Sequence, residues 1–423
     1  MRPYLSLQPR SKVWIYLCLA AIAVVTSLFL VRNVDLRVYW YGVNGFFSHT
    51  RPAYGPESGL GFPMEYRYPP VTYLLLIPLK LLPLRIAGFW WMLAAWIAAV
   101  ASVSIAIDIR KLRFSGRSML ACFAFMLAYL VLAIHYGNVQ PFVIACLFAA
   151  LALSERKPIW SGVLLALAVT FKIWPILFLP WCFHRARRRS VAYFVLAMAV
   201  LWILPFPVFG IARYWALLHA WYTAVGRVGT TYSEFYYFPG QSLRGLLLRY
   251  FTPVAPPLKT FPEIHVLSLS PRLAVMIWMI AGAAIYGFFA ICMLRSNPQK
   301  LWAWDGLAFV LYSLLEPYAV KSGLISLGPA ALTAACLFTL GTSRTPGVAE
   351  MPERRRSVFW ANRLFLAACA LSFLGAIVQY KPWQRFLLTV GLDFWAEVLL
   401  LSALFIWIVF TSLPEAVSQS DPN

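Results

Sequence analysis

The sequence predicts a polytopic, all-α membrane protein, and three observations support that fold class. Hydrophobic residues make up 61% of the 423 positions, charged residues only 12%, and the mean hydropathy is +0.73. A soluble domain carries roughly 25% charged residues, so too few charges are present to cover a water-exposed surface. The apolar runs are continuous rather than alternating, which favours transmembrane helices over barrel strands. We therefore expect a single integral-membrane domain over residues 1–423.

Apolar runs predict about twelve spans. They cover residues 14–31, 86–107, 119–134, 141–154, 159–171, 173–183, 191–209, 271–294, 303–317, 323–340, 359–378 and 386–410. The first run follows basic residues, as a signal peptide would, but it is long enough to span and no small-residue cleavage site follows it. We expect it to be a retained helix. The run at 71–82 is too short to cross and is bracketed by prolines, which indicates an interfacial or re-entrant helix.

Basic residues in short loops predict the orientation of the chain in the membrane. With the N-terminus inside, the inner loops contain basic clusters at 110–117, 156–157, 185–189, 295–300 and 344–356. Positive charge marks the cytoplasmic side of membrane proteins. Both termini are then cytoplasmic in the cell (inner) membrane, and two long loops, about 32–85 and 210–270, are extracytoplasmic. Helices over about 303–410 complete the domain.

The net charge of +21 would suggest nucleic acid in a soluble protein, but here the basic loops account for much of it. We expect no nucleic-acid partner. The seven cysteines lie in or beside apolar segments without a CxxC pair, and the five histidines form no HExxH pair. These patterns predict neither a metal site nor another cofactor.

Asp35 follows the first predicted span directly, between Arg32 and Arg37. A carboxylate at an apolar mouth on the membrane surface can act as a general base. The neighbouring guanidinium groups would hold its pKa down. The alternative is an interfacial ion pair that anchors the end of the helix.

Further polar and aromatic side chains lie on the same predicted outer face. Four cations are candidates for binding a lipid phosphate, because guanidinium and ammonium groups pair with phosphate oxygens; they are Lys172, Arg244, Arg67 and Lys321. Candidates for contact with a sugar or an acceptor are Glu65, Tyr68, His135, Asn138, Gln140, Tyr237, Gln241 and Glu316. Each group also has a structural explanation: local ion pairs, a hairpin turn, a snorkelling lysine or an interfacial aromatic belt.

This pattern resembles the polyprenyl-phosphate-sugar-dependent glycosyltransferases of the GT-C fold, in particular family 87, which includes bacterial α-mannosyltransferases. The matching features, in chain order, are Asp35 with Tyr39; Tyr68-Pro69-Pro70; Gly137, Asn138 and Gln140; Gly162, Lys172 and Pro175; Arg185–Arg189; and Gln241, Ser242 and Leu243 with Arg249. The order and topology cover most of the chain.

The resemblance implies that Asp35 is the catalytic base and that the first outer loop carries short juxtamembrane helices. It also implies a polyprenyl-phosphate monosaccharide donor, with mannose as the expected sugar, a glycolipid or glycan acceptor, and inversion at the anomeric carbon. The chain departs from the family at Glu316–Lys321, where members often carry a Ser-Pro-x-Ser-Trp segment with a histidine. Two other functions stay open: a transporter or flippase of a lipid-linked saccharide, and a non-catalytic assembly subunit.

Overall fold

The structure is a computed structural model, and every regular element in the part of the chain that it describes is a helix. The described residues are 21, 34–61, 64–110, 112, 114–230, 240–253, 261–317, 319–342, 352–378 and 380–410. In chain order the elements are α2 (Val34–Phe47), η1 (Pro56–Ser58), α3 (Val71–Leu75), η2 (Ile77–Leu81), α4 (Leu84–Arg110), α5 (Gly116–Tyr136), α6 (Gln140–Leu153), α7 (Pro158–Phe171), η3 (Trp174–Phe178), α8 (Leu179–Cys182), α9 (Arg189–Ile203), α10 (Pro205–Phe209), α11 (Ile211–Thr230), α13 (Leu243–Phe251), α14 (Pro271–Leu294), η4 (Pro298–Lys300), α15 (Leu301–Leu315), η5 (Lys321–Leu327), α16 (Gly328–Thr342), α17 (Pro352–Ile377), α18 (Lys381–Thr389) and α19 (Leu392–Phe410).

Long apolar helices confirm the predicted fold class. Six segments of the described chain are long and apolar enough to cross a membrane: Leu84–Arg110, Arg189–Phe209, Pro271–Leu294, Gly323–Leu340, Arg355–Ile377 and Leu392–Phe410. Three shorter apolar helices accompany them, at Gly116–Leu130, Gln140–Leu153 and Pro158–Phe171. The first predicted span, 14–31, lies outside the described residues apart from Ala21. The expected count of about twelve spans stays a prediction.

Four predicted spans are each divided between two elements. The run at 191–209 is α9 followed by α10, and the run at 323–340 is η5 followed by α16. The run at 173–183 is the 3₁₀ helix η3 followed by α8, and each begins with a proline in its first turn, Pro175 and Pro180. A proline cannot donate the backbone hydrogen bond that a continuing helix needs. The run at 386–410 is divided into α18 and α19 by Gly391, whose φ of 77° favours glycine. The breaks at 173–183 and 386–410 therefore come from local backbone chemistry.

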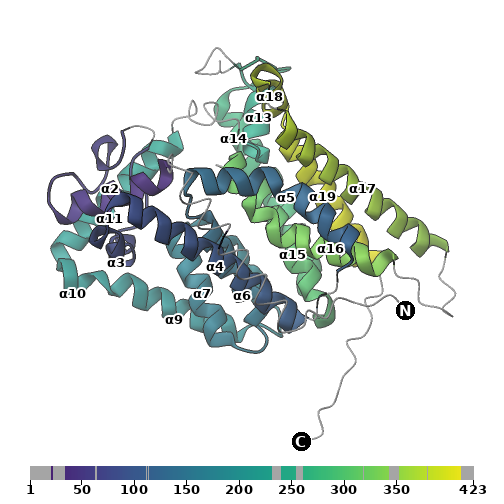
Figure 1. The fold of residues 1–423 in the computed structure, drawn as a ribbon, viewed down its shortest axis with the longest axis horizontal. Coiled ribbons are helices and arrows are strands. Elements are labelled where there is room, and N and C mark those ends of the chain that lie inside the picture. Colours follow the sequence, from purple (N-terminus) through teal and green to yellow (C-terminus); the bar gives the residue numbers. More distant parts are fainter. Residues whose placement is uncertain are drawn as a thin grey trace, which may run out of the picture.

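The two predicted outer loops contain helices that pack against each other. The first loop forms α2, α3 and η2, which confirms the short helices expected around 71–82. The second loop contains α11 and α13, helices that the sequence analysis did not predict at these positions. Figure 1 shows α2 and α3 beside α10 and α11. Phe46 of α2 lies 5.5 Å from Phe209 between ring centroids, and the guanidinium of Arg213 lies 5.4 Å from the Phe46 ring.

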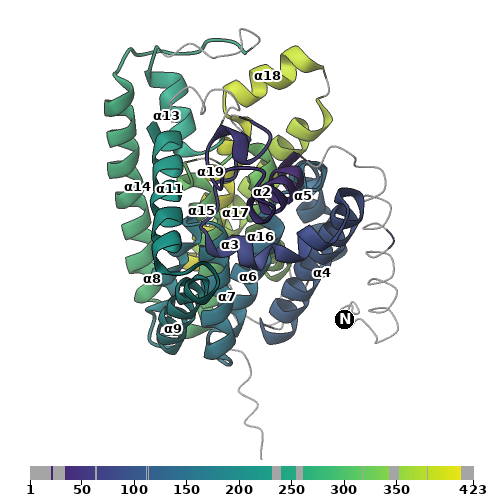
Figure 2. The ribbon, with the colours of Figure 1, turned by 90° about the vertical axis from the view of Figure 1, so that its left-hand side faces the viewer.

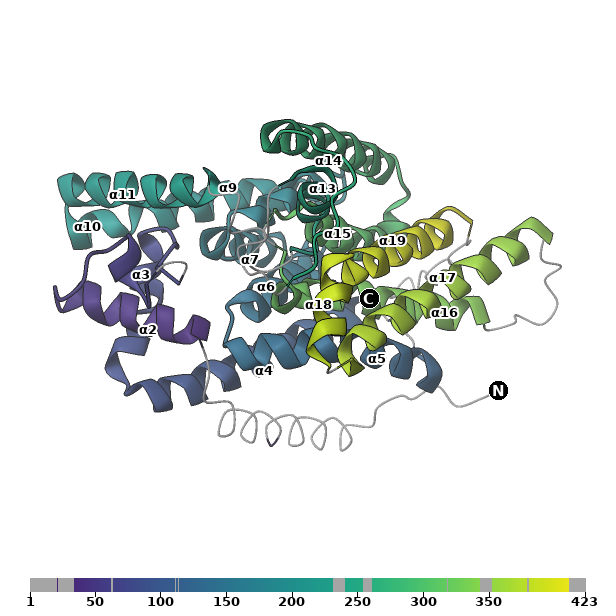
Figure 3. The ribbon, with the colours of Figure 1, turned by 90° about the horizontal axis from the view of Figure 1, so that it is seen from above.

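The interior of the bundle is formed around α15, which is buried along nearly its whole length. Helix α15 contacts α14, α16 and α19, and Figure 3 shows it inside the bundle between α14 and α19. In contrast, α9 and α14 expose many apolar side chains, as expected of helices that face lipid. Figure 2 shows α13 and α18 at one end of the molecule and the junction of α8 with α9 at the other. The polar clusters described below lie toward these two ends.

Candidate active site

Asp35 lies in the first turn of α2, where its side chain is partly buried. The side-chain amide of Asn138 donates a hydrogen bond to Asp35 Oδ2 at 2.8 Å. Burial raises the pKa of Asp35 to about 6, although the charge of Lys172 and the hydrogen bond from Asn138 act in the opposite direction. Burial therefore outweighs the nearby positive charge, contrary to the depressed pKa that the sequence predicts. A carboxyl group with this pKa is mostly ionised at pH 7 and can accept a proton.

The turn between α5 and α6 holds Asn138 in position. The Oδ1 atom of Asn138 accepts a hydrogen bond of 2.7 Å from the backbone N–H of Gln140, so its Nδ2 group points at Asp35. Gly137 has a φ of 63°, which permits this tight turn, and its carbonyl accepts from the Trp91 indole at 3.0 Å. The hydrogen bonds to Gln140 and Trp91 therefore hold the turn, and with it the Asn138 amide that donates to Asp35.

Tyr39 lies one turn along α2 from Asp35, on the same face of the helix. Its hydroxyl is 2.9 Å from that of Tyr68 and accepts the backbone N–H of Val139 at 3.2 Å. Burial raises the pKa of Tyr39 and of Tyr68 well above the usual range, so both stay neutral. The family features Asp35, Tyr39, Tyr68 and Asn138 are thus brought together in space.

Lys172 follows the C-terminal end of α7 and its ammonium lies 3.4 Å from Glu316 Oε1. Glu316 follows α15, so this ion pair connects the ends of two helices. The hydroxyl of Tyr312 also interacts with Glu316 and accepts a hydrogen bond of 3.3 Å from Gln140 Nε2. Because the charge of Lys172 acts on Asp35 as well, the carboxylate, the cation and the amides form one cluster.

The extended segment before α3 contains Glu65, Arg67 and Tyr68. Glu65 is buried and its carboxylate lies 3.6 Å from Arg67 Nη2. The backbone carbonyl of Arg67 accepts from the Trp221 indole at 3.0 Å, which ties this segment to α11. The charges of Arg67 and Glu316 both act on the Tyr68 hydroxyl, so the segment borders the same cluster.

Gln241 and Arg244 lie at the start of α13. The backbone N–H of Gln241 donates to Ala319 O at 2.6 Å, and its side-chain amide donates to Leu388 O at 3.0 Å. The guanidinium of Arg244 lies 5.4 Å from the ring of Trp278, and that ring is 6.5 Å from Trp174. The rings of Trp278 and Trp174 therefore connect Arg244 to the segment that follows Lys172. Their roles toward a substrate stay predictions.

The remaining predicted residues are distributed differently. Lys321 donates to Gly375 O at 2.9 Å and lies 3.7 Å from Asp393 Oδ2, so it faces α17 and α19. His135 is partly buried, with its ring 5.2 Å from that of Tyr136. Tyr237 lies outside the described residues. The structure places Lys321 in a second buried polar group, and its phosphate-binding role stays a prediction.

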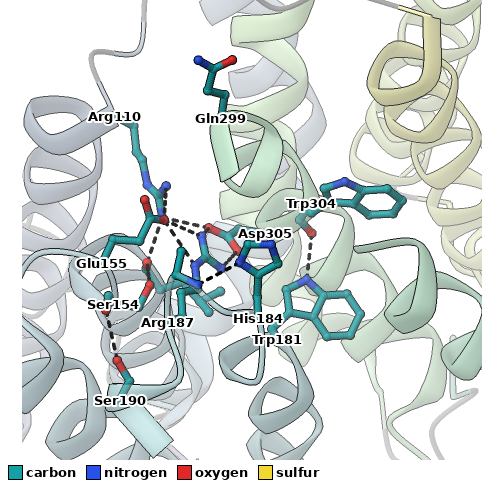
Figure 4. A network of polar contacts seen from close by, with 12 residues as sticks. Arg110, Ser154, Glu155, Trp181, His184, Arg187, Ser190, Gln299, Trp304 and Asp305 are labelled. Carbon is teal, nitrogen blue, oxygen red and sulfur yellow. Dashed lines mark hydrogen bonds and ion pairs between the residues drawn. The ribbon is translucent and has the colours of Figure 1, made fainter. Parts of the chain in front are cut away.

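Sequence reasoning missed a network of four charges, two of them buried, at the α8–α9 end of the protein, which Figure 4 shows. Arg187 is fully buried and contacts Asp305 at 2.5 and 2.9 Å and Glu155 at 3.2 Å. Arg110 contacts the same two acids, at 3.0 Å to Glu155 and 3.2 Å to Asp305. The two positive and two negative charges balance, and each arginine lies within 3.2 Å of both acids. An aspartate inside an apolar helix, Asp305, was the signal in the sequence.

Burial and positive charge act oppositely on Glu155 of this network. Although burial opposes ionisation, Arg110 and Arg187 hold the pKa of Glu155 below its usual value. The network joins the ends of α4, α6 and α15 to the segment before α9. We interpret it as a structural connection, because its charges are fully paired with one another.

Comparison with known proteins identifies the family. Residues 66–317, more than half of the chain, match the model of glycosyltransferase family 87. The chain belongs to glycosyltransferase family 87. The protein is therefore a membrane glycosyltransferase, and the predicted family is confirmed. The matched segment contains Tyr68, Asn138, Lys172 and Glu316, whereas Asp35 precedes it, so the assignment of Asp35 depends on the geometry described above.

The structure of ArnT from Cupriavidus metallidurans bound to undecaprenyl phosphate is similar at 14% identity and a TM-score of 0.36, over 95% of this chain and 78% of that chain. No curated protein matches the chain.

Proposed function

We propose that this protein transfers a mannosyl group from a polyprenyl-phosphate donor to a hydroxyl group of a glycolipid or glycan on the extracytoplasmic face of the membrane. The family match supports glycosyl transfer. The observation that carries the mechanism is the contact of Asp35 with Asn138 at 2.8 Å, beside the charge of Lys172. A base and a cation close together are what transfer from a phosphate requires.

In the proposed reaction, Asp35 accepts the proton of the acceptor hydroxyl. The hydroxyl oxygen then bonds to the anomeric carbon from the face opposite the phosphate, so the configuration inverts. The bond between that carbon and the phosphate oxygen breaks, and its electrons stay on the phosphate. Asn138 orients the base, because its amide is itself held by the Gln140 backbone. Tyr39 and Tyr68 remain neutral and pack the wall of the site.

Lys172 and Arg244 are proposed to bind the departing phosphate, with Arg67 and Lys321 as the other predicted cations. Positive groups that are already in place stabilise charge as it develops on a leaving oxygen. Side chains can supply this charge, so we propose that no metal cofactor takes part. Glu65, His135, Gln140 and Gln241 stay candidates for contact with the sugar or the acceptor.

The test is a sugar-transfer assay with radiolabelled polyprenyl-phosphate mannose and a cell-envelope lipid extract as acceptor. Protein with Asp35→Asn should retain no more than about a hundredth of wild-type transfer, because a general base typically contributes 10²–10⁴-fold. Asn44→Ala, on the same helix, serves as the control; its amide contacts only Trp40 O at 2.9 Å among the hydrogen bonds that the structure shows. Full activity of the Asp35 variant would remove the base from the mechanism.

The same assay in detergent separates the enzyme from a transporter or flippase. Transport has no meaning without a sealed membrane, whereas glycosyl transfer still yields a labelled product. A wild-type protein that forms no labelled product with any donor sugar, but moves labelled lipid across vesicles, would favour the transporter.

A further inference from the structure

The cation proposed to bind the donor phosphate already has an anionic partner. Lys172 Nζ lies 3.4 Å from Glu316 Oε1, and their side chains are only 22% and 5% exposed. A buried ammonium without a partner is costly, commonly by several kcal/mol. Glu316 therefore stabilises the charge of Lys172 when no donor is bound. A phosphate that approaches Lys172 must compete with this carboxylate.

We propose that Glu316 is an internal counter-ion, which holds the phosphate position on Lys172 in the donor-free protein and is displaced, and protonated, when the donor phosphodiester binds. This proposal rests on the proposed function, because it takes Lys172 as the phosphate-binding cation. It departs from the sugar or acceptor contact that the sequence predicts for Glu316. The pattern of contacts favours the new role, since the carboxylate points at the cation.

The surroundings of Glu316 explain why displacement is coupled to a proton. Tyr312 contacts it from α15, Tyr68 faces it from the first outer loop and Glu397 faces it from α19, while Lys172 follows α7. Glu397 is fully buried, and Ser313 interacts with its carboxylate. Among these neighbours Lys172 is the residue whose charge favours the Glu316 carboxylate, and the same charge also acts on Asp35 of α2.

A donor phosphate bound to Lys172 would remove the stabilisation that Lys172 gives to the Glu316 carboxylate. A phosphodiester carries one negative charge, so it neutralises Lys172 as completely as Glu316 does. If Glu316 stayed ionised, the phosphate would add a third anion to Glu316 and Asp35 around Lys172, in a site of low dielectric where like charges repel strongly. Uptake of one proton by Glu316 restores the net charge of the donor-free site. The bound site then contains a paired lysine and phosphate next to a neutral carboxylic acid.

The replacement of the Glu316 carboxylate by a singly charged phosphodiester also distinguishes the donor from the polyprenyl phosphate that remains after sugar transfer. Transfer of the sugar converts the diester into a phosphate monoester, whose second ionisation has a pKa of about 6. The doubly charged monoester carries one negative charge more than the Glu316 carboxylate that it replaces. The return of the Glu316 carboxylate to Lys172 then favours release of the carrier, and Glu316 acts as a specificity-determining residue for the singly charged diester.

The experiment measures binding of the methyl diester of undecaprenyl phosphate, which cannot transfer a sugar and has no second ionisation. Purified protein in detergent is titrated at pH 6, 7 and 8, with binding followed by tryptophan fluorescence. For the wild type, Kd should rise with pH by up to tenfold per pH unit, because one proton is taken up with each ligand. Glu316→Gln should bind about tenfold or more tightly at pH 8, and between pH 7 and 8, above the pKa of Asp35, its Kd should no longer rise with pH.

Two further variants control for charge and for folding. Glu57→Gln removes the same charge from an exposed position of the first outer loop and should behave as the wild type. Glu316→Asp keeps the charge and should restore the pH dependence. If Glu316→Gln binds no more tightly than the wild type, or if Glu57→Gln tightens binding equally, the counter-ion proposal is overturned. Wild-type protein that binds the diester in this pH-dependent manner but transfers no sugar would instead overturn the proposed function.

Discussion

Asp35 should give glycosyl transfer a pH dependence that an ordinary surface aspartate cannot produce. Its pKa is raised to about 6 by burial, whereas an unperturbed aspartate has a pKa near 3.9. If the carboxylate is the active form, kcat/KM should fall by about tenfold per pH unit below pH 6. The rate at pH 5 should be about a tenth of that at pH 8. A base with an ordinary pKa would retain most of its activity at pH 5.

Asn138 gives this prediction a second test. Its amide donates to Asp35 Oδ2 at 2.8 Å and lowers the pKa of the carboxyl, because it stabilises the ionised form. A hydrogen bond to a charged group contributes roughly 1.5–3 kcal/mol, and one pKa unit corresponds to 1.36 kcal/mol. Asn138→Ala should therefore move the acid limb of the profile from about 6 to about 7 or 8.

The assay is kcat/KM for mannosyl transfer between pH 4.5 and 9 in mixed buffers of constant ionic strength. The donor is a phosphodiester and does not titrate in this range, so the limb reports on the protein. Asn44→Ala, a change of the same kind on α2, should leave the limb unmoved. The reasoning is refuted if wild-type activity is flat from pH 5 to 8, or if Asn138→Ala lowers the rate without shifting the limb.

Three further predictions follow from the same contacts. The folded-state pKa of Asp35, about 6, exceeds its unfolded value, so ionising this carboxyl destabilises the folded state. The stability that Asp35 contributes is present below pH 4 and is lost as the pH rises through 6. Asp35→Asn should therefore raise the free energy of unfolding at pH 8 by up to about 3 kcal/mol, and thermal unfolding at pH 4 should show no such effect. Arg187→Ala should lower the free energy of unfolding by about 3–5 kcal/mol because it leaves Asp305 buried without its closest cation, whereas Arg188→Ala, at an exposed position, should change it by under about 0.5 kcal/mol in thermal or denaturant unfolding. Lys172→Ala should raise the KM for the polyprenyl-phosphate donor more than it lowers kcat, with Lys157→Ala as an exposed control; an unchanged KM would remove Lys172 from the donor site.

Local sequence patterns predicted the helices well where the apolar runs were long. Helices α4 and α14 match the runs at 86–107 and 271–294, because a chain in lipid must satisfy its backbone hydrogen bonds within each segment. The predictions were wrong where proline or glycine chemistry outweighed hydropathy, at 173–183 and at Gly391. Helix α11 was missed because its apolar residues are mixed with polar ones, as is usual for a helix that packs at a loop rather than spans lipid.

The candidate site was predicted in its residue types but not in its pairings. Asp35 and Asn138 were singled out, yet their hydrogen bond joins positions 103 residues apart, and no local pattern specifies such a contact. Glu316 was assigned to a sugar, whereas the structure pairs it with Lys172. The sequence predicted a lowered pKa for Asp35, whereas burial raises it. The neighbouring arginines are visible in the sequence, but the burial of the carboxyl is not.

Composition and the length of the apolar runs therefore determined, by themselves, that this protein is a helical membrane protein. The order of polar motifs along the chain also indicated its glycosyltransferase family. These properties depend on the transfer of whole segments from water to lipid, which is a sum over many residues and tolerates local errors. Tertiary structure alone decided which acid faces which cation, how deeply Asp35 is buried and that Arg187 lies between Glu155 and Asp305. Such contacts depend on the packing of helix ends to within an ångström, and electrostatic energy in a low-dielectric interior changes steeply over that distance.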